Sequence, residues 1–590
     1  MLEEQRHKTQ EALRLLMPED RHHKHHEGFL IQILEITIPK EGLLLIIILI
    51  EESIHNLQID EIIALREIIP LVELVVIGLL LEVQAMQVAA ALLQEVPQPD
   101  QHHHLQEVHL LQEVVQGVLE KINKKINMKK FLFLIGGLLS SVAINAQVIS
   151  YSDAAILFSG EDNNGTARFN AMSGAFGALG GDLSAGDVNP AGLAVFNNSQ
   201  TSISFGLRNT DILSSFYGTN TNNNDDYFNL TQAGGVMIFN NRGNSNWSKI
   251  ALGFNYTLAK DFENNFIIEG NSGESDFIVG PTGTSNLSYD PYLNYDNDID
   301  NDIFYDNVEG QFFGNFTSGQ NEKFTFSIAG QYNEKMLIGL SVVTHSLEYY
   351  QRTLFEHSSN DGNANLFDAS LLQELYTFGD GVGFNIGFIA KPSNEVRLGL
   401  AYQTPIWYNL TDEFVEDLEI SVSNDSEIYT EFSDVNLFDY KMNTPSKLTG
   451  SFAYILGKEG IISFDYTYKN FTNTTLKPTS EFVDENDLFA NALKNTSTFK
   501  VGAEWRLDNV SLRGGYHFEE SPYEDAINSD NIEGYSLGVG FKFGGNVKLD
   551  LAYQNSTNTD VYSFLNKDGV TPAELDIDND KFTATIVIGL

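Results

Sequence analysis

The sequence contains no cysteine, which excludes disulfide bonds and thiolate metal sites. It is also poor in basic residues, because 35 Lys and Arg stand against 80 Asp and Glu and leave a formal net charge of −45. Binding to nucleic acid requires a basic surface that can contact phosphates. The charge balance therefore argues against a nucleic-acid partner.

Long apolar runs are missing as well. Two runs near the N-terminus, 43–50 and 71–81, fall short of the ~20 residues that a membrane-spanning helix needs. No run of that length follows residue 147. Inside a bilayer every backbone polar group needs a partner within the protein, and a closed β-barrel also provides one. If the chain crosses a membrane, we expect it to do so with strands.

Aromatic residues are missing from the first part of the chain. Residues 1–127 contain neither Tyr nor Trp, whereas all 24 Tyr and all 3 Trp lie beyond them. The segment has histidine runs, but these lack the mixed, spaced ligands of a metal site. We interpret 1–127 as a spurious upstream extension. The alternatives are a helical soluble domain, a disordered segment or an internal uncleaved anchor.

A signal peptide is predicted directly after this segment. From Met128 the sequence reads MKKFLFLIGGLLSSVAINAQ, with two lysines, a short apolar run and small residues before Gln147. This order is typical of a secretory signal peptide. We predict that Met128 is the true start, that 128–146 is the signal peptide and that cleavage falls between Ala146 and Gln147.

A glycine-rich stretch follows at 167–196, ARFNAMSGAFGALGGDLSAGDVNPAGLAVF. Its glycines permit turns and close backbone packing, and its small apolar residues suit a compact plug. Taken alone, the stretch would favour a glycine-rich loop at a domain edge over a plug, and the strand pattern that follows it changes this interpretation. The residues on which the plug interpretation depends are Asn189, Pro190, Ala191, Gly174, Gly177, Gly180 and Gly181.

The rest of the chain has the pattern of β-strands. In 460–469, apolar Ile462, Phe464 and Tyr466 alternate with polar residues, and many later segments do the same. Such segments of about ten residues are typical of a barrel with one apolar and one polar face. We predict fourteen strands at about 200–209, 232–240, 247–258, 323–332, 335–348, 382–391, 395–407, 446–456, 460–469, 497–506, 509–517, 534–543, 546–555 and 581–590.

The connections between these strands alternate between short turns and long loops. The loops 210–231, 259–322, 349–381 and 408–445 are long, for example, whereas the turn at 333–334 is short. A soluble β-sandwich also has alternating strands, but it has no reason to keep its long loops at one end. Strict alternation favours an even-stranded outer-membrane barrel.

The glycine-rich segment, its Asn189-Pro190-Ala191 motif and the hairpin GVGFNIGFIAKPSNEVRLGLAYQTP at 381–405 resemble the FadL family of outer-membrane transporters. The resemblance covers 147–590. It implies an all-β protein with a 14-stranded antiparallel transmembrane β-barrel at 200–590 and an N-terminal hatch at 147–199 that plugs the lumen. One departure is Leu590, because such barrels usually end in an aromatic residue.

The resemblance also implies a function. Members take up long-chain fatty acids and, in some relatives, aromatic hydrocarbons. The ligand is captured in the extracellular loops, moves to a site beside the hatch and leaves sideways through a gap in the wall. Candidate ligand-binding residues, for which loop packing is the alternative role, are Phe266, Ile267, Ile268, Leu372, Leu375, Tyr376, Ile406 and Trp407.

The expected location is the outer membrane. The expected partners are its lipid and lipopolysaccharide, the barrel assembly machinery and a hydrophobic ligand, and the expected state is a monomer without cofactors. A structural or adhesive barrel without transport is the alternative function.

Other functions have weaker support. His345, His357 and His517 belong to no nucleophile–base motif, so we expect no enzyme. Asp296, Asp298, Asp300 and Asp302 resemble part of a calcium loop but lack its glycine and closing glutamate, so we predict a solvated acidic loop and no metal site. Weak bridging of such loops to lipopolysaccharide by divalent ions remains an alternative.

Overall fold

The computed structural model describes residues 149–241, 245–274, 307–363, 365–423, 428–544, 546–565 and 569–590. The chain divides into two units, 1–140 and 141–590, and all described residues belong to the second. The predicted extension 1–127, the signal peptide 128–146, the cleavage site Ala146–Gln147 and the acidic run at 296–302 lie outside the described residues.

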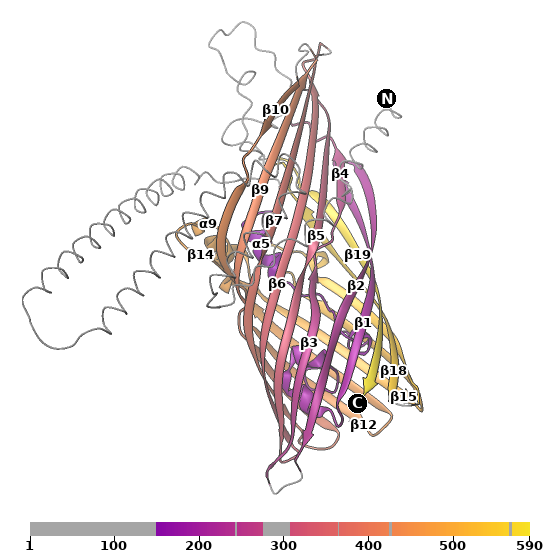
Figure 1. Ribbon diagram of the computed structural model, residues 1–590. Coiled ribbons are helices and arrows are strands. Elements are labelled where there is room, and N and C mark those ends of the chain that lie inside the picture. Colours follow the sequence, from indigo (N-terminus) through magenta and orange to yellow (C-terminus); the bar gives the residue numbers. More distant parts are fainter. Residues whose placement is uncertain are drawn as a thin grey trace, which may run out of the picture. The chain divides into compact units, whose positions relative to one another are not determined.

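Fourteen strands form a closed antiparallel barrel (Figure 1). Each pairs with the next in the order below, and the last pairs with the first over sixteen residue pairs, from Gln200↔Gly589 to Ser215↔Glu574. This confirms the predicted fold class. The strands are β1 (Gln200–Phe216), β2 (Thr219–Asn240), β3 (Trp247–Asp261), β5 (Asn307–Tyr332), β6 (Met336–Asn360), β7 (Leu366–Ala390), β8 (Val396–Gln403), β12 (Lys447–Leu456), β13 (Gly460–Asn470), β15 (Asn495–Leu507), β16 (Val510–Glu519), β17 (Ile532–Lys542), β18 (Val547–Tyr562) and β19 (Ala573–Gly589).

Several predicted loops are strands. β1 and β2 continue through the predicted loop 210–231 and meet at the turn Tyr217–Gly218. Likewise, β6 and β7 occupy most of 349–381. The prediction was wrong here because it relied on strict alternation of apolar and polar residues. The backbone ladder continues where one face mixes both kinds, as with buried Phe355 beside buried His357 on β6.

Exposed apolar side chains form a band around the outside of the barrel. On β1 the outward residues Ile203, Phe205 and Leu207 are apolar, whereas Asn209 and Asp211 follow farther along the strand. Outer-membrane barrels present such a band, flanked by aromatic residues, to the ~25 Å hydrocarbon layer. The exposed aromatic residues include Trp247, Tyr402, Tyr454, Tyr468, Trp505, Tyr516 and Tyr535.

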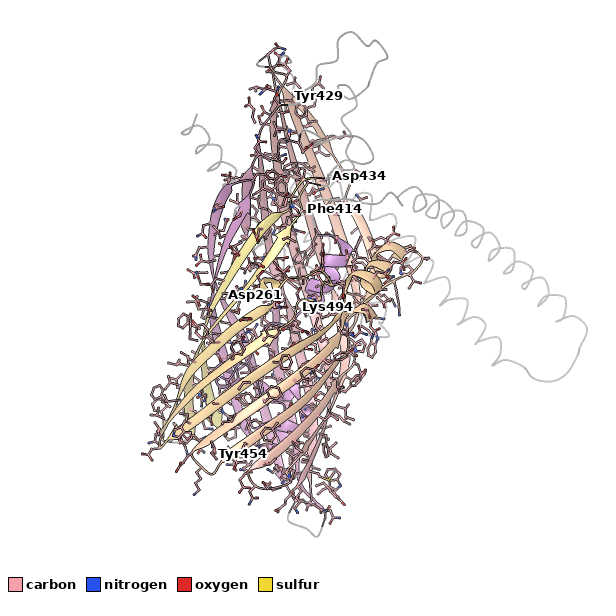
Figure 2. The ribbon with its side chains drawn as sticks, turned by 180° about the vertical axis from the view of Figure 1, so that it is seen from behind. Asp261, Phe414, Tyr429, Asp434, Tyr454 and Lys494 are labelled. Atoms are coloured by element: carbon pink, nitrogen blue, oxygen red, sulfur yellow. The ribbon has the colours of Figure 1, made fainter. Side chains whose placement is uncertain are left out.

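The barrel has a short-turn end and a long-loop end. Figure 2 shows Tyr454 at the short-turn end and Tyr429 at the opposite one. Beyond the apolar band five further strands extend the sheet towards the long-loop end. These are β4 (Phe266–Gly270), β9 (Trp407–Val422), β10 (Ile428–Phe432), β11 (Asn436–Asn443) and β14 (Thr475–Lys477).

The hatch, residues 149–199, lies inside the barrel (Figure 1). The side chains of Ser150 and Thr166 cap its first two helices by accepting hydrogen bonds from backbone N–H groups. Among the described residues, no helix is long and apolar enough to cross a membrane. The hatch helices are α5 (Tyr151–Ser159), α6 (Ala167–Asn170), α7 (Ala185–Val188) and η2 (Pro190–Val195).

Two apolar cores lie towards the long-loop end. The first, the inner core, surrounds α5 and includes Phe158, Tyr349 and Tyr408. The second, the outer core, includes Phe313, Phe355 and Phe564. The inner core is completed by α9 (Val483–Ala492) and η4 (Phe471–Asn473), and the remaining short helix is η5 (Asn528–Asp530).

Candidate functional site

The Asn189-Pro190-Ala191 motif joins two parts of the hatch to the barrel wall. The Asn189 Nδ2 donates hydrogen bonds to the backbone oxygens of Gly177, at 2.7 Å, and Phe388, at 3.2 Å. Its Oδ1 accepts one from the N–H of Ala191 at 3.1 Å. Pro190 follows at the start of η2, where its fixed φ suits a helix. The motif lies against β7, close to the short-turn end.

Glycines of the wall let the hatch backbone lie directly against the strands. A Cβ atom on Gly339 would collide with Pro190, and one on Gly387 would collide with Asn189. Gly399 is packed in the same way against the backbone of Gly177. Glycine inside a strand often marks a close approach by another backbone. This signal was present in the sequence but was not used.

The predicted hatch glycines have two roles. Gly174, Gly180 and Gly181 have φ values of 76°, 60° and 68°, which side chains strongly disfavour. Gly177 instead faces β13, where its N–H donates a hydrogen bond to the Asp465 carboxylate at 2.8 Å. The glycine-rich sequence therefore allows both the turns and the close contact with the wall.

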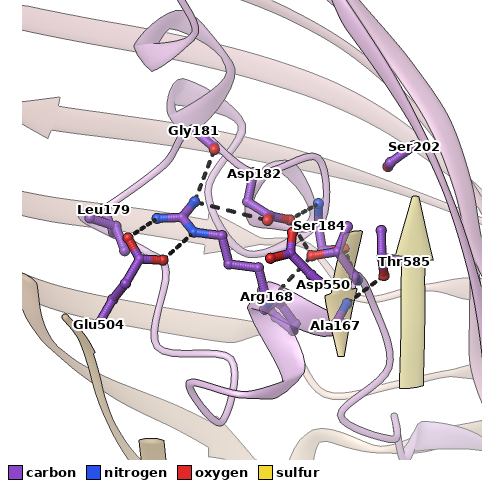
Figure 3. Close-up of polar contacts among 12 residues, drawn as sticks. Ala167, Arg168, Leu179, Gly181, Asp182, Ser184, Ser202, Glu504, Asp550 and Thr585 are labelled. Atoms are coloured by element: carbon purple, nitrogen blue, oxygen red, sulfur yellow. Dashed lines mark hydrogen bonds and ion pairs between the residues drawn. The ribbon is translucent and has the colours of Figure 1, made fainter. Parts of the chain in front are cut away.

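A buried ionic network holds the opposite side of the hatch (Figure 3). The Arg168 Nε lies 2.7 Å from Glu504 on β15, and the same carboxylate lies 2.8 Å from the Arg513 Nε on β16. Arg513 continues to Asp550 on β18 at 2.6 Å. Because these groups are buried, each depends on its partners for compensation of its charge. Nothing in the sequence pattern identified this network.

A small cavity lies between the hatch and the wall. Its volume is about 20 Å³, which is room for about one water molecule. Phe158 and Val343 give it an apolar side, and Asn385 and Gln403 a polar one. A volume of this size holds nothing larger than a water molecule.

Two lysines and two carboxylates also line the cavity and form three ion pairs. The Glu161 carboxylate of the hatch lies 2.6 Å from the Lys447 Nζ and 3.3 Å from the Lys323 Nζ. Asp187, also on the hatch, lies 3.8 Å from the Lys323 Nζ. Two wall lysines therefore face two hatch carboxylates.

The wall beside the cavity is interrupted. β8 ends at Gln403 and β9 begins at Trp407, while β11 ends at Asn443 and β12 begins at Lys447. The pairs Asn443↔Trp407 and Lys447↔Gln403 share one register, since both number pairs add up to 850.

This register places Pro405 opposite Pro445, and neither residue has an N–H group for the ladder. We call this position the proline rung. Neighbouring hydrogen bonds join Thr444 and Ile406 at 3.1 and 2.9 Å. Both Ile406 and Pro445 line the cavity, so the weakened rung borders it.

Comparisons with known proteins point to outer-membrane proteins. The family model for "Outer membrane protein transport protein (OMPP1/FadL/TodX)" matches residues 292–585. By this match, residues 292–585 belong to the FadL family. Outer membrane protein P1 of Haemophilus influenzae is 26% identical over 180 residues, which are 29% of this chain and 37% of that protein. The chain thus matches little more than a third of that relative's length.

Solved structures of similar proteins were also found. A FadL homologue of Pseudomonas aeruginosa covers 73% of this chain and 99% of its own, at 14% identity and a TM-score of 0.47. The Pseudomonas putida toluene transporter TodX covers the same shares at 12% identity and a TM-score of 0.46.

The FadL family consists of outer-membrane transport proteins, so the expectation that this chain is not an enzyme is confirmed. The three histidines are spread over two strands, with His345 beside the cavity, His357 farther along β6 and His517 on β16. In the described part of the chain, no group of three or more His, Asp or Glu residues could hold a metal ion.

The structure separates the predicted ligand-binding residues of this FadL-family protein. Of the predicted set, Ile406 lines the cavity. Leu375 belongs to the inner core, and Phe266, Ile267 and Ile268 are buried at the long-loop end.

The other three predicted residues lie on the face of their strands that points away from the buried side chains. Leu372 and Tyr376 alternate with the buried residues of β7. Tyr376 stacks on Phe378, with 5.1 Å between the ring centroids. Trp407 is 40% exposed beside Phe384. Sequence reasoning missed Glu161, Lys323 and Lys447. The two lysines could have been identified from the sequence, because each is a charged residue at an inward position of a strand.

Proposed function

We propose that this FadL-family protein carries hydrophobic small molecules, such as long-chain fatty acids, passively across the outer membrane. The observation that carries the proposal is the position of the cavity. It lies between the hatch and the wall, combines apolar and charged lining, and borders the proline rung. A structural barrel has no need for a partly apolar cavity at an interrupted part of its wall.

Capture would begin at the outer core. Phe266 and Ile268, two of the predicted ligand residues, pack there with Phe313, Phe355 and Phe564. Burying apolar ligand surface gains roughly 25 cal/mol per Å². Aromatic side chains that separate briefly could therefore accept an acyl chain or an aromatic hydrocarbon before it moves inwards.

Exit would be lateral and controlled by the hatch. At the proline rung the ladder has lost backbone donors from both strands, so parting the strands there breaks fewer hydrogen bonds than elsewhere. Because Ile406 and Pro445 line the cavity, a ligand held beside the hatch would already face this rung.

A cross-link tests this route, and the lack of native cysteine makes the test specific. Thr404→Cys with Ser446→Cys would bridge the two strands next to the proline rung, because 404 and 446 share its register. Thr449→Cys with Thr467→Cys is the control, since these side chains face each other within β12 and β13 at 2.9 Å.

Oxidation should reduce fatty-acid uptake in the first variant, reduction should restore it, and the control should stay unchanged. Full uptake with the rung cross-linked would remove the lateral exit at this place. If cells take up neither fatty acids nor aromatic hydrocarbons through the native protein, the alternative of a structural or adhesive barrel is the better account.

The remaining assignments are proposals on the same basis. We propose a monomer, because the sheet is closed and leaves no barrel edge free. The apolar band would contact membrane lipid, polar residues beyond it lipopolysaccharide, and the barrel assembly machinery would insert the chain. For the domains, N-terminal sequencing of the membrane protein should find Gln147, and peptides from 1–127 in the mature chain would contradict the proposed start at Met128.

A further inference from the structure

We propose that Glu161 occupies the site of a ligand carboxylate, so that an anionic amphiphile enters the cavity by displacing Glu161 from Lys323 and Lys447. The inference rests on the proposed transport function and adds to it a way to release the hatch, in which the carboxylate of the ligand takes the place of Glu161.

The lysines belong to the wall and the carboxylate to the hatch. Lys323 is on β5 and Lys447 begins β12, and both strands are fixed in the closed ladder. Glu161 lies just after α5, in a stretch between two hatch helices without regular structure. Each of its two oxygens meets a different lysine, at 2.6 and 3.3 Å. The site is thus two fixed ammonium groups bridged by one movable carboxylate.

The second hatch carboxylate is held differently. Asp187 accepts hydrogen bonds from Thr257 at 2.7 Å and from Asn255 at 3.1 Å, in addition to facing Lys323. In the described part of the chain, the Glu161 carboxylate contacts the two lysines and no other polar group. Glu161 is therefore the group that can leave without breaking other hydrogen bonds.

A free carboxylate is a matched replacement. If Glu161 simply withdrew, the cavity would keep an excess positive charge, and leaving a buried charge without its partner is strongly unfavourable. A ligand carboxylate restores the charge balance and has the same shape as the group that it replaces. A neutral head group does neither.

The surroundings suit the rest of such a ligand. Phe158, Val343, Ile406 and Pro445 line the cavity next to the lysines. The present volume of about 20 Å³ holds no acyl chain, so binding requires the segment that carries Glu161 to move. Ligand binding and opening of the hatch would then be one event.

The experiment compares two probes of equal length, hexadecanoic acid and hexadecan-1-ol, bound to the purified full-length barrel in nanodiscs. Glu161→Gln removes the competing charge and should tighten binding of the acid about tenfold, with the alcohol changed less than about twofold. Lys447→Met should weaken binding of the acid about tenfold and leave binding of the alcohol nearly unchanged. Heat-modifiable gel mobility confirms that each variant is folded.

Asp162→Asn is the matched control. Asp162 adjoins Glu161 and also joins the hatch to the wall, through Lys260 at 2.9 Å, but it does not line the cavity. It should leave the ratio of acid to alcohol affinity unchanged.

An equal gain in affinity for both probes in Glu161→Gln would mean that Glu161 only holds the hatch to the wall. That result would contradict the proposed exchange of carboxylates. Unchanged binding of both probes would overturn it as well, with the transport proposal intact. If the native protein neither binds nor transports either probe, the proposed function itself fails.

Discussion

The hatch touches the wall in two chemically different ways. On one side, η2 packs its backbone against wall glycines of β6 and β7, with Asn189 as the polar link. On the other, Arg168 enters an ionic network with Glu504, Arg513 and Asp550. We call these the packed contact and the charged contact.

The difference indicates which part of the hatch is fixed. In the packed contact the wall residues are glycines, so no wall side chain can adjust, and interiors tolerate little added volume. A charged contact can adjust its side chains but fails when one partner is removed. The segment of Glu161 lies outside the packed contact, which agrees with its proposed movement.

The largest expected effect comes from breaking the charged contact. Glu504→Gln would leave Arg168 and Arg513 without their shared carboxylate, at a cost of roughly 3–5 kcal/mol to the seated hatch. Hydrogen exchange at 167–181 should become much faster while the strands stay protected. Glu374→Gln, which removes a half-exposed pair with Arg352, is the control and should cost at most ~1 kcal/mol. Equal exchange in both variants would contradict the importance of the network.

A slightly smaller effect is expected from adding volume to the packed contact. Gly387→Val places side-chain atoms where Asn189 and Pro190 lie, and overpacking of this kind costs roughly 1–3 kcal/mol. We expect faster hydrogen exchange at 186–196. Gly450→Val is the matched control, because a Cβ there meets no atom within 4 Å. A normally protected η2 in Gly387→Val would show that the packed contact is looser than the structure indicates.

Substitutions in the Asn189-Pro190-Ala191 motif test whether seating of the hatch affects transport. Asn189→Leu removes the hydrogen bonds to Gly177 and Phe388, and Pro190→Gly frees the turn. Each lost hydrogen bond of a buried group costs roughly 1–3 kcal/mol. The barrel should still fold, because its ladder does not include the hatch, but fatty-acid uptake should change. Unchanged uptake with a displaced hatch would count against transport and favour a structural barrel.

A further expected effect is a pH dependence of the hatch near α5, outside the apolar band. Burial raises the pKa of Asp412 on β9 to about 7, against hydrogen bonds from Thr377, Tyr440 and Tyr151 that lower it. The folded state therefore holds a proton that the unfolded state has lost, and stability falls as pH rises from about 4 to about 7.

Hydrogen exchange of α5, corrected for intrinsic rates, should thus show less protection at pH 8 than at pH 5. Asp412→Asn should remove the difference. Greater protection at pH 8 than at pH 5 would contradict the raised pKa.

The sequence predicted the barrel because many membrane-facing segments alternate apolar outward residues with small or polar ones, as with Ile203, Phe205 and Leu207 on β1. It could not predict the full length of β6 and β7, since apolar and polar residues are mixed on both faces there and break the alternation. Nor could it separate Ile406 from Trp407. Which of two neighbouring loop residues faces the lumen depends on the register at the proline rung, and that requires the paired strands.

Closure of the barrel brings the hatch and the last strand together, and this sets an order of assembly. The Ala167 N–H donates to the Thr585 hydroxyl at 2.6 Å, across 418 positions, and the Leu590 N–H donates to the Ser199 oxygen at 2.9 Å. The hatch precedes every barrel strand in the chain, yet several of its partners belong to the last strand. It must therefore wait, unseated, until β19 arrives, so seating of the hatch and closing of the wall form one late, long-range step.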